Sequence, residues 1–180
     1  QPTSLYRIAS LNKLLTATAI MKLVEDGKLR LDDRLLPLLG DWAPPAVRIR
    51  DVRVNDITIR QLLQHTAGFD RAKSGDPLFG SRAINAVKRQ DGVLPPTCDI
   101  VLRDTLESPL DFAPGARYAY SNIGYCALGR VIERLTGAPV SADAAAAAAS
   151  MDIGSLIKEL IASGAGGAIL TAIVGMIKNR

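Results

Sequence analysis

The stretch Arg7-Ile8-Ala9-Ser10-Leu11-Asn12-Lys13 (residues 7–13) places a lysine three residues after a serine, where an apolar repeat of helical period begins. Residues three apart on a helix share one face, so the Ser10 hydroxyl and the Lys13 amine are expected to lie together. Far downstream, Tyr120-Ser121-Asn122 adds a phenol and an amide. A hydroxyl, an amine and a phenol are the groups required for serine acyl transfer that uses lysine in place of histidine.

The Ser-x-x-Lys spacing is not specific by itself. Ser155 and Lys158 repeat it without a supporting motif, and Ser10 alone also fits an ordinary helix-start serine beside a surface lysine. A serine nucleophile needs a base within hydrogen-bond reach. A lysine serves as that base only where burial or a helix N-terminus disfavours its cation, and the expected position of Ser10 at a helix start meets both conditions.

Further motifs follow in order along the chain. They are Leu23-Val24-Glu25-Asp26-Gly27-Lys28-Leu29 with Leu31-Asp32-Asp33, Ile57-Thr58-Ile59-Arg60-Gln61-Leu62-Leu63-Gln64-His65-Thr66-Ala67-Gly68, Pro114-Gly115 leading to Tyr118-Ala119-Tyr120-Ser121-Asn122-Ile123-Gly124-Tyr125, and Leu128-Gly129 with Thr136-Gly137. With the segment 6–17, they resemble the serine β-lactamase and penicillin-binding-protein superfamily. The resemblance is strongest to the branch of class C β-lactamases, D-alanyl-D-alanine carboxypeptidases and esterases, and covers residues from about 5 to 139.

The resemblance implies a bacterial serine hydrolase that acts through an acyl-enzyme on a β-lactam, a D-Ala-D-Ala-type peptide or a small ester, without cofactor or metal. It implies that Ser10 is the acylated nucleophile, Lys13 its amine partner and Tyr120 a proton shuttle to the leaving group. Asn122 is implied to bind substrate or the lysine, although from the residues alone it also fits a helix N-cap. His65 is expected to be structural, because no spacing in the chain indicates a triad.

The chain departs from the family pattern at both ends. Nothing after Pro139 matches the third motif, Lys-Thr-Gly or His-x-Gly, and only nine residues precede Ser10. We therefore expect a mainly α fold (α+β at most), the helical subdomain with little of the sheet, plus a C-terminal helical hairpin. The expected division is a truncated family domain (1–139), an alanine-rich linker or helix (140–150) and an apolar helical tail (151–180). The alternative is an inactive fragment or interaction module that self-associates.

Local patterns predict the individual elements. Helices are expected over 10–26, ending at Gly27; from the capping box Thr58–Gln61 through His65; and over 80–90, 98–107 and 123–136, ending at Gly137. An extended segment is expected over 29–39. Arg48, Arg50 and Arg53 alternate with apolar residues, which indicates a short strand.

Composition narrows the function classes. The net charge is +4, but aromatic residues are only 4% and no binding motif accompanies the arginines, which argues against a nucleic-acid partner and leaves a small-molecule substrate. One histidine without a cysteine cluster argues against a zinc site. Cys98 and Cys126 can pair, but their spacing does not require it, and the apolar pattern around Cys126 favours a buried free thiol.

The C-terminal part has a different composition. Residues 144–149 are all alanine, and residues 161–177 carry no charge, a length at the lower limit for crossing a bilayer. Two interpretations stay open, a helical hairpin packed on a core or partner and a membrane-active tail. No signal peptide is recognisable in the chain, so an extracytoplasmic or periplasmic location rests on the resemblance alone.

Overall fold

The computed structural model describes residues 9–137, whose regular secondary structure is almost entirely helical. Their elements, in chain order, are η1 (Ala9–Leu11), α1 (Asn12–Glu25), α2 (Leu35–Leu39), η2 (Gly40–Trp42), η3 (Ala46–Arg48), η4 (Val52–Asp56), α3 (Ile59–Leu63), α4 (Arg71–Ser74), α5 (Gly80–Arg89), α6 (Cys98–Glu107) and α7 (Asn122–Thr136). Within this part of the chain, β structure is confined to one antiparallel bridge between Arg34 and Thr58. The expected mainly α fold is confirmed.

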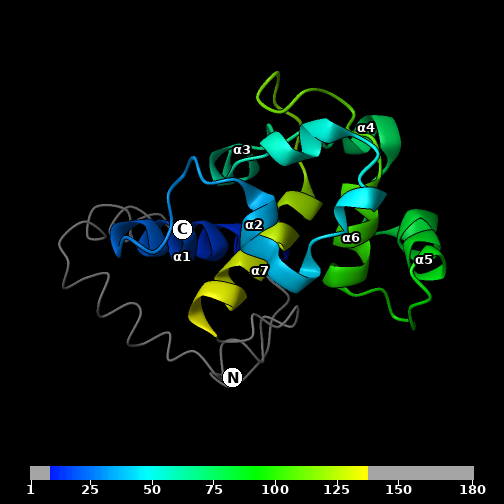
Figure 1. The fold of residues 1–180 in the computed structure, drawn as a ribbon, viewed down its shortest axis with the longest axis horizontal. Helices are drawn as coiled ribbons and strands as arrows, with labels where there is room; N and C mark the ends of the chain where they lie inside the picture. Colours follow the sequence, from blue (N-terminus) through cyan, green and yellow to red (C-terminus); the bar gives the residue numbers. More distant parts are fainter. Residues whose placement is uncertain (1–8, 138–180) are drawn as a thin grey trace, which may run out of the picture. The chain divides into compact units, whose positions relative to one another are not determined.

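Helix α7 organises the core. It packs against α1, α2, α3 and α6, while α5 packs on α6 (Figure 1). Ala127, Leu128, Val131, Ile132 and Leu135 recur along α7 at helical spacing; the first four are buried and Leu135 is partly buried against the core. The start of α7 is thereby held close to α1, which is the arrangement that assembles the site described below.

Several helix ends form as their sequence signals predict. Thr58 and Gln61 make the reciprocal capping box at the start of α3. Gly137 adopts the left-handed conformation at the end of α7, with φ of 70°. The N-cap of α7 is Ser121, whose hydroxyl accepts from the Gly124 N–H at 3.2 Å. The N-cap interpretation of Asn122 is therefore wrong, and the Asn122 side chain makes other contacts.

The two extended segments predicted between the first helix and residue 56 do not form. Leu35–Leu39 is the helix α2, which tolerates Pro37 because the first N–H groups of a helix have no intrahelical partner. The arginine-rich segment folds into the 3₁₀ turns η3 and η4. Here Arg48 pairs with Glu107, at the end of α6, at 3.0 Å, and Arg53 pairs with its neighbour Asp51 at 2.6 Å.

Helix α1 is less buried than its apolar pattern predicts. Ile20 and Leu23 are buried, but Leu14, Leu15 and Met21 are exposed. Among the described helices, α1 packs chiefly on α7, which covers only one of its sides. The opposite side therefore presents an apolar face, made of Leu11, Leu14, Leu15 and Met21, which we call the α1 apolar face.

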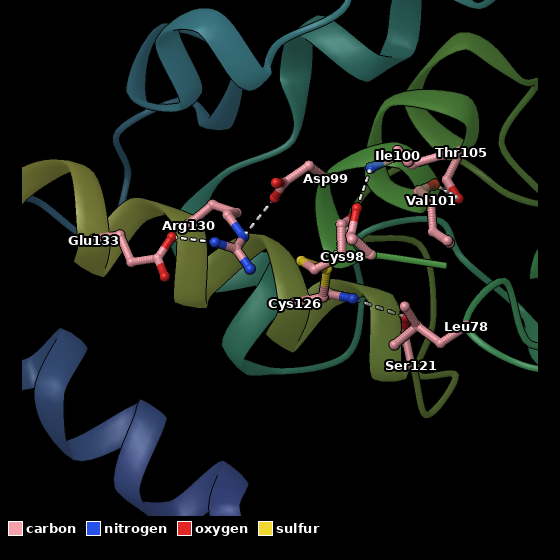
Figure 2. Close-up of a disulfide and its surroundings, with 12 residues drawn as sticks. Leu78, Cys98, Asp99, Ile100, Val101, Thr105, Ser121, Cys126, Arg130 and Glu133 are labelled. Carbon is pink, nitrogen blue, oxygen red and sulfur yellow. Dashed lines mark hydrogen bonds and ion pairs between the residues drawn. A yellow bond between two sulfur atoms is a disulfide. The ribbon is translucent and has the colours of Figure 1, made fainter. Parts of the chain in front are cut away.

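A disulfide joins Cys98, the first residue of α6, to Cys126 of α7, with the two Cα atoms 6.0 Å apart (Figure 2). The expectation of a free thiol at Cys126 is therefore wrong. The pair forms because the first turn of α6 lies against α7, which the linear spacing does not reveal. One turn further along α7, Arg130 forms ion pairs with Asp99 (2.8 Å) and Glu133, so charge pairs flank the cross-link.

The expectations for the alanine run and the C-terminal hairpin lie outside the described residues. Within residues 9–137, every helix is too short or too polar to cross a bilayer.

Candidate active site

Ser10 lies in the 3₁₀ turn η1, immediately before α1, and its side chain is exposed. The preceding residue, Ala9, has φ of 45°, in the left-handed region that residues with a Cβ seldom occupy. Backbone of this kind costs free energy and persists where the surrounding structure requires it, often beside functional groups. The turn directs the Ser10 hydroxyl toward the segment that enters α7.

The structure brings together the four side chains singled out from the sequence. The Ser10 Oγ lies 2.7 Å from the Tyr120 Oη, and the Lys13 Nζ lies 3.5 Å from the Ser10 Oγ. The same Nζ donates to the Asn122 Oδ1 at 2.7 Å. Serine and lysine come from the start of α1, while tyrosine and asparagine come from the start of α7, so the packing of these two helices builds the cluster.

Tyr120 is held in place by the segment that follows α3. The Ala119 N–H donates to the His65 carbonyl at 2.8 Å, and the Ser121 N–H donates to the His65 Nδ1 at 3.2 Å. The ring centroids of His65 and Tyr120 are 4.7 Å apart. His65 thus fixes the backbone on both sides of Tyr120 and supports one side of its ring.

Positive charges surround the Tyr120 phenol. The Lys13 Nζ lies 4.9 Å from the centroid of its ring, and the Arg71 Cζ lies 4.7 Å from it. Burial by itself raises the pKa of the phenol. Hydrogen bonds with Lys13 and Ser10 and the charges of Lys13 and Arg71 act in the opposite direction and prevail, so the pKa of Tyr120 lies below its usual value of 10.0. The phenolate is therefore easier to form here than in water.

His65 is kept neutral by its surroundings. Burial, followed by the nearby charge of Lys13, lowers the pKa of His65 below 6.5. Its Nδ1 accepts a backbone hydrogen bond and must be unprotonated to do so. This geometry favours the structural role expected from the sequence.

Two charged residues of the site were missed in the sequence. The Asn122 Nδ2 donates to the Asp76 Oδ2 at 2.7 Å, and Arg71 lies on the Tyr120 ring. Asp76, Arg71 and Asn122 line a small hollow. Both missed residues belong to a polar, turn-rich segment, and the Asp76-Pro77 dipeptide signals only a turn. No local pattern connects them with residues about 50 positions away.

Residues 9–137 contain no group of three or more His, Cys, Asp or Glu side chains arranged to hold a metal ion.

Comparison with known proteins gives consistent matches. The profile of the family described as β-lactamase matches residues 1–145. A probable fimbrial assembly protein FimD of Dichelobacter nodosus is 39% identical over 134 residues, and this alignment covers 74% of the chain and 30% of the relative. A putative D-alanyl-D-alanine carboxypeptidase of Escherichia coli K12 is 33% identical, and the alignment covers 76% of this chain and 30% of the relative. Esterase EstB of Burkholderia gladioli is also 33% identical, and the alignment covers 77% of this chain and 34% of the relative.

Comparison with solved structures gives matches of the same kind. A D-stereospecific amidohydrolase from Streptomyces sp. superposes with a TM-score of 0.53 at 31% identity, covering 74% of this chain and 38% of that one. The octameric penicillin-binding protein homologue of Pyrococcus abyssi gives the same TM-score at 30% identity, covering 74% and 28%. The chain spans about a third of the length of the curated relatives it matches. With the profile matching most of its length, the chain belongs to the β-lactamase family.

Proposed function

We propose that the cluster at the starts of α1 and α7 is the acyl-transfer site of a serine hydrolase, with Ser10 as the nucleophile. The observation that carries the proposal is the 2.7 Å contact between the Ser10 Oγ and the Tyr120 Oη, a distance at which a proton can pass between them. Membership of a family whose named relatives include a carboxypeptidase and an esterase supports the same reaction class.

In the proposed acylation step, the Tyr120 phenolate takes the Ser10 proton while the Oγ attacks the carbonyl carbon of the substrate. The phenol then returns this proton to the leaving nitrogen or oxygen as the scissile bond breaks, which leaves an ester on Ser10 for water to cleave. Tyr120 is better placed than Lys13 to accept the proton, since the Lys13 Nζ is 3.5 Å from the Oγ. Lys13 then acts mainly by stabilising the phenolate, in contrast to the base role inferred from its spacing.

The proposed substrates are small esters or amides, including D-Ala-D-Ala-type peptides and β-lactams, because each presents an acyl carbon to the same nucleophile. Carboxypeptidase, esterase and amidohydrolase all occur among the names of similar proteins. Different leaving groups are compatible with one proton donor in the position of Tyr120.

Turnover of a p-nitrophenyl ester, a D-alanyl-D-alanine peptide and a penicillin tests the proposal. We expect at least one to be hydrolysed, with activity lost in Ser10→Ala. Ser155→Ala removes the other Ser-x-x-Lys pair of the sequence and serves as the matched control, which should retain wild-type rates. Hydrolysis that persists in Ser10→Ala, or no hydrolysis of any of the three, contradicts the proposal.

The α1 apolar face favours a second candidate, an inactive module that acts by association. Leu11, Leu14 and Leu15 are 64%, 60% and 53% exposed, and adjacent apolar side chains of this kind are typical of a surface that binds another protein. Light scattering over a concentration series distinguishes the candidates. A monomer with esterase activity excludes this second one, whereas a stable oligomer without activity supports it.

A further inference from the structure

Asp76 contacts the candidate site through Asn122. One of its carboxylate oxygens, Oδ1, accepts from the Leu78 N–H at 3.1 Å, within the turn that leads to α5. The other, Oδ2, accepts from the Asn122 Nδ2 at 2.7 Å. The carboxylate is partly buried, and its neighbour Pro77 is buried, so the turn holds the Asp76 side chain in a defined position.

The orientation of the Asn122 amide depends on what lies at each of its ends. The oxygen and nitrogen of an asparagine amide have nearly the same shape, so hydrogen-bond partners decide which way it points. The Lys13 ammonium can only donate, and an ionised carboxylate can only accept. With Lys13 on one side and Asp76 on the other, the amide satisfies both partners in one orientation, and rotation by 180° would oppose donor to donor and acceptor to acceptor.

We propose that Asp76 is a positioning residue of this site, which holds the Asn122 carbonyl toward Lys13 and thereby keeps the Lys13 Nζ beside Ser10 and Tyr120. The contacts form one continuous chain from Tyr120 through Ser10, Lys13 and Asn122 to Asp76. Without the carboxylate, the amide can rotate and present its NH₂ group to the lysine, which removes the acceptor that locates Nζ. The inference rests on the proposed function for the use that the site makes of Lys13.

A double-mutant cycle between Asp76 and Asn122 tests the proposal through the acylation rate. Asp76→Ala is expected to lower kcat by roughly 10²-fold, the effect of a displaced catalytic group, with KM unchanged because Asp76 acts through Asn122 rather than on substrate. In the Asn122→Ala background, Asp76→Ala should have no further effect. Losses that multiply in the double variant overturn the proposal.

Asp111→Asn is the matched control. Asp111 lines the same hollow and accepts from the Asp70 N–H and the Ser74 Oγ, but it does not bond Asn122. Asp111→Asn removes one negative charge from the hollow but leaves the bond between Asp76 and Asn122 intact. We therefore expect this variant to keep the wild-type rate. A loss equal to that of Asp76→Ala would show that charge alone is responsible and would overturn the proposal.

Hydrogen exchange at the Asn122 side-chain amide, followed by NMR, provides a readout that does not require activity. Its NH₂ protons should be protected in the wild-type chain and in Asp111→Asn, and should exchange faster in Asp76→Ala. This outcome in a chain that fails to hydrolyse any substrate rejects the proposed function but keeps the positioning contact. An active chain whose Asn122 amide is unaffected by Asp76→Ala rejects the inference alone.

Discussion

The Tyr120 side chain makes three kinds of contact with its neighbours. It contacts the Ser10 hydroxyl at 2.7 Å, carries two cations against its ring and rests on the His65 imidazole. Such an arrangement stabilises a negative oxygen beside a hydroxyl, which a proton acceptor requires. The lowered pKa of Tyr120 is a consequence of these same contacts, which place the hydroxyl and the two positive charges beside the phenol.

Removing the phenolic oxygen should therefore slow acylation more than it alters folding. For Tyr120→Phe, we expect the rate of Ser10 modification by a penicillin or an activated ester to fall about 10²–10⁴-fold, the usual contribution of a general base. Tyr118→Phe is the control, since the Tyr118 side chain is exposed and belongs to the same segment. Equal rates in wild type and Tyr120→Phe would exclude Tyr120 as the proton acceptor.

Arg71 should contribute, after Lys13 and Ser10, to the pH at which the site becomes active. Its charge favours the phenolate, so its removal raises the pKa of Tyr120. Because kcat/KM rises with pH as the phenolate forms, Arg71→Ala should move the midpoint of this rise to higher pH. Arg71→Lys keeps the charge and should move it less. A midpoint that stays in place, or moves to lower pH, in Arg71→Ala contradicts this account.

His65 should make stability depend on pH in one direction. Its pKa is lowered in the folded chain, so the unfolded chain binds the proton first as the pH falls. The stabilisation is therefore complete above about pH 6.5, the pKa of an unfolded histidine, and is lost progressively below it. His65 is the only histidine of the sequence, so no other histidine contributes to this pH dependence.

Denaturant unfolding of wild type and His65→Gln between pH 5 and pH 8 measures this dependence. The difference between their free energies of unfolding should shrink as the pH falls, because all other titrating groups are shared. A difference that is constant over this range would show that His65 has no lowered pKa.

Among the elements, α7 packs against four other helices, and the disulfide links its second turn to α6. The cross-link closes a loop with a sequence separation of 28. In the chain-entropy description, a loop of this length stabilises the folded state by about 3–4 kcal/mol. The first residue of α7, Asn122, belongs to the candidate site, so the same cross-link helps to hold the site together.

Reduction should accordingly lower the free energy of unfolding of the wild-type chain by about this amount. Urea unfolding with and without a reductant measures the change, and the double variant Cys98→Ser/Cys126→Ser should not respond to the reductant. A wild-type chain that unfolds identically in both conditions would show that the two cysteines are not linked.

Element by element, the sequence predicts structure where the signal is local. The capping box Thr58–Gln61 and the glycine after α7 act through neighbouring backbone groups, and both appear as expected. The alternation around Arg50 failed because a short period-2 pattern forms a strand only when a partner strand is available. The extended segment expected over 29–39 instead contains α2, and Pro37 is compatible with this helix because early in a helix its missing N–H costs nothing.

The same distinction applies to the site as a whole. Ser10 and Lys13 are one turn apart, and Tyr120 and Asn122 were found through the family motif, so all four could be placed in advance. Asp76 and Arg71 reach the cluster only because the turn-rich segment folds over the start of α7. Contacts between residues about 50 positions apart produce no recognisable pattern in a single sequence. The Cys98–Cys126 link was undetermined for the same reason.

At the scale of the molecule, the described residues form a helical unit around one hydrophobic core, and the α1 apolar face is exposed. The chain corresponds to about a third of its curated relatives, and within that third the four motif side chains are in contact. We propose that this contact makes Ser10 reactive.

The most direct test is incubation of the chain with a fluorophosphonate, followed by mass spectrometry of the intact protein and of its peptides. The account predicts a single adduct, located on the peptide that contains Ser10 and absent from Ser10→Ala. No adduct, or an adduct on a different serine, would contradict it.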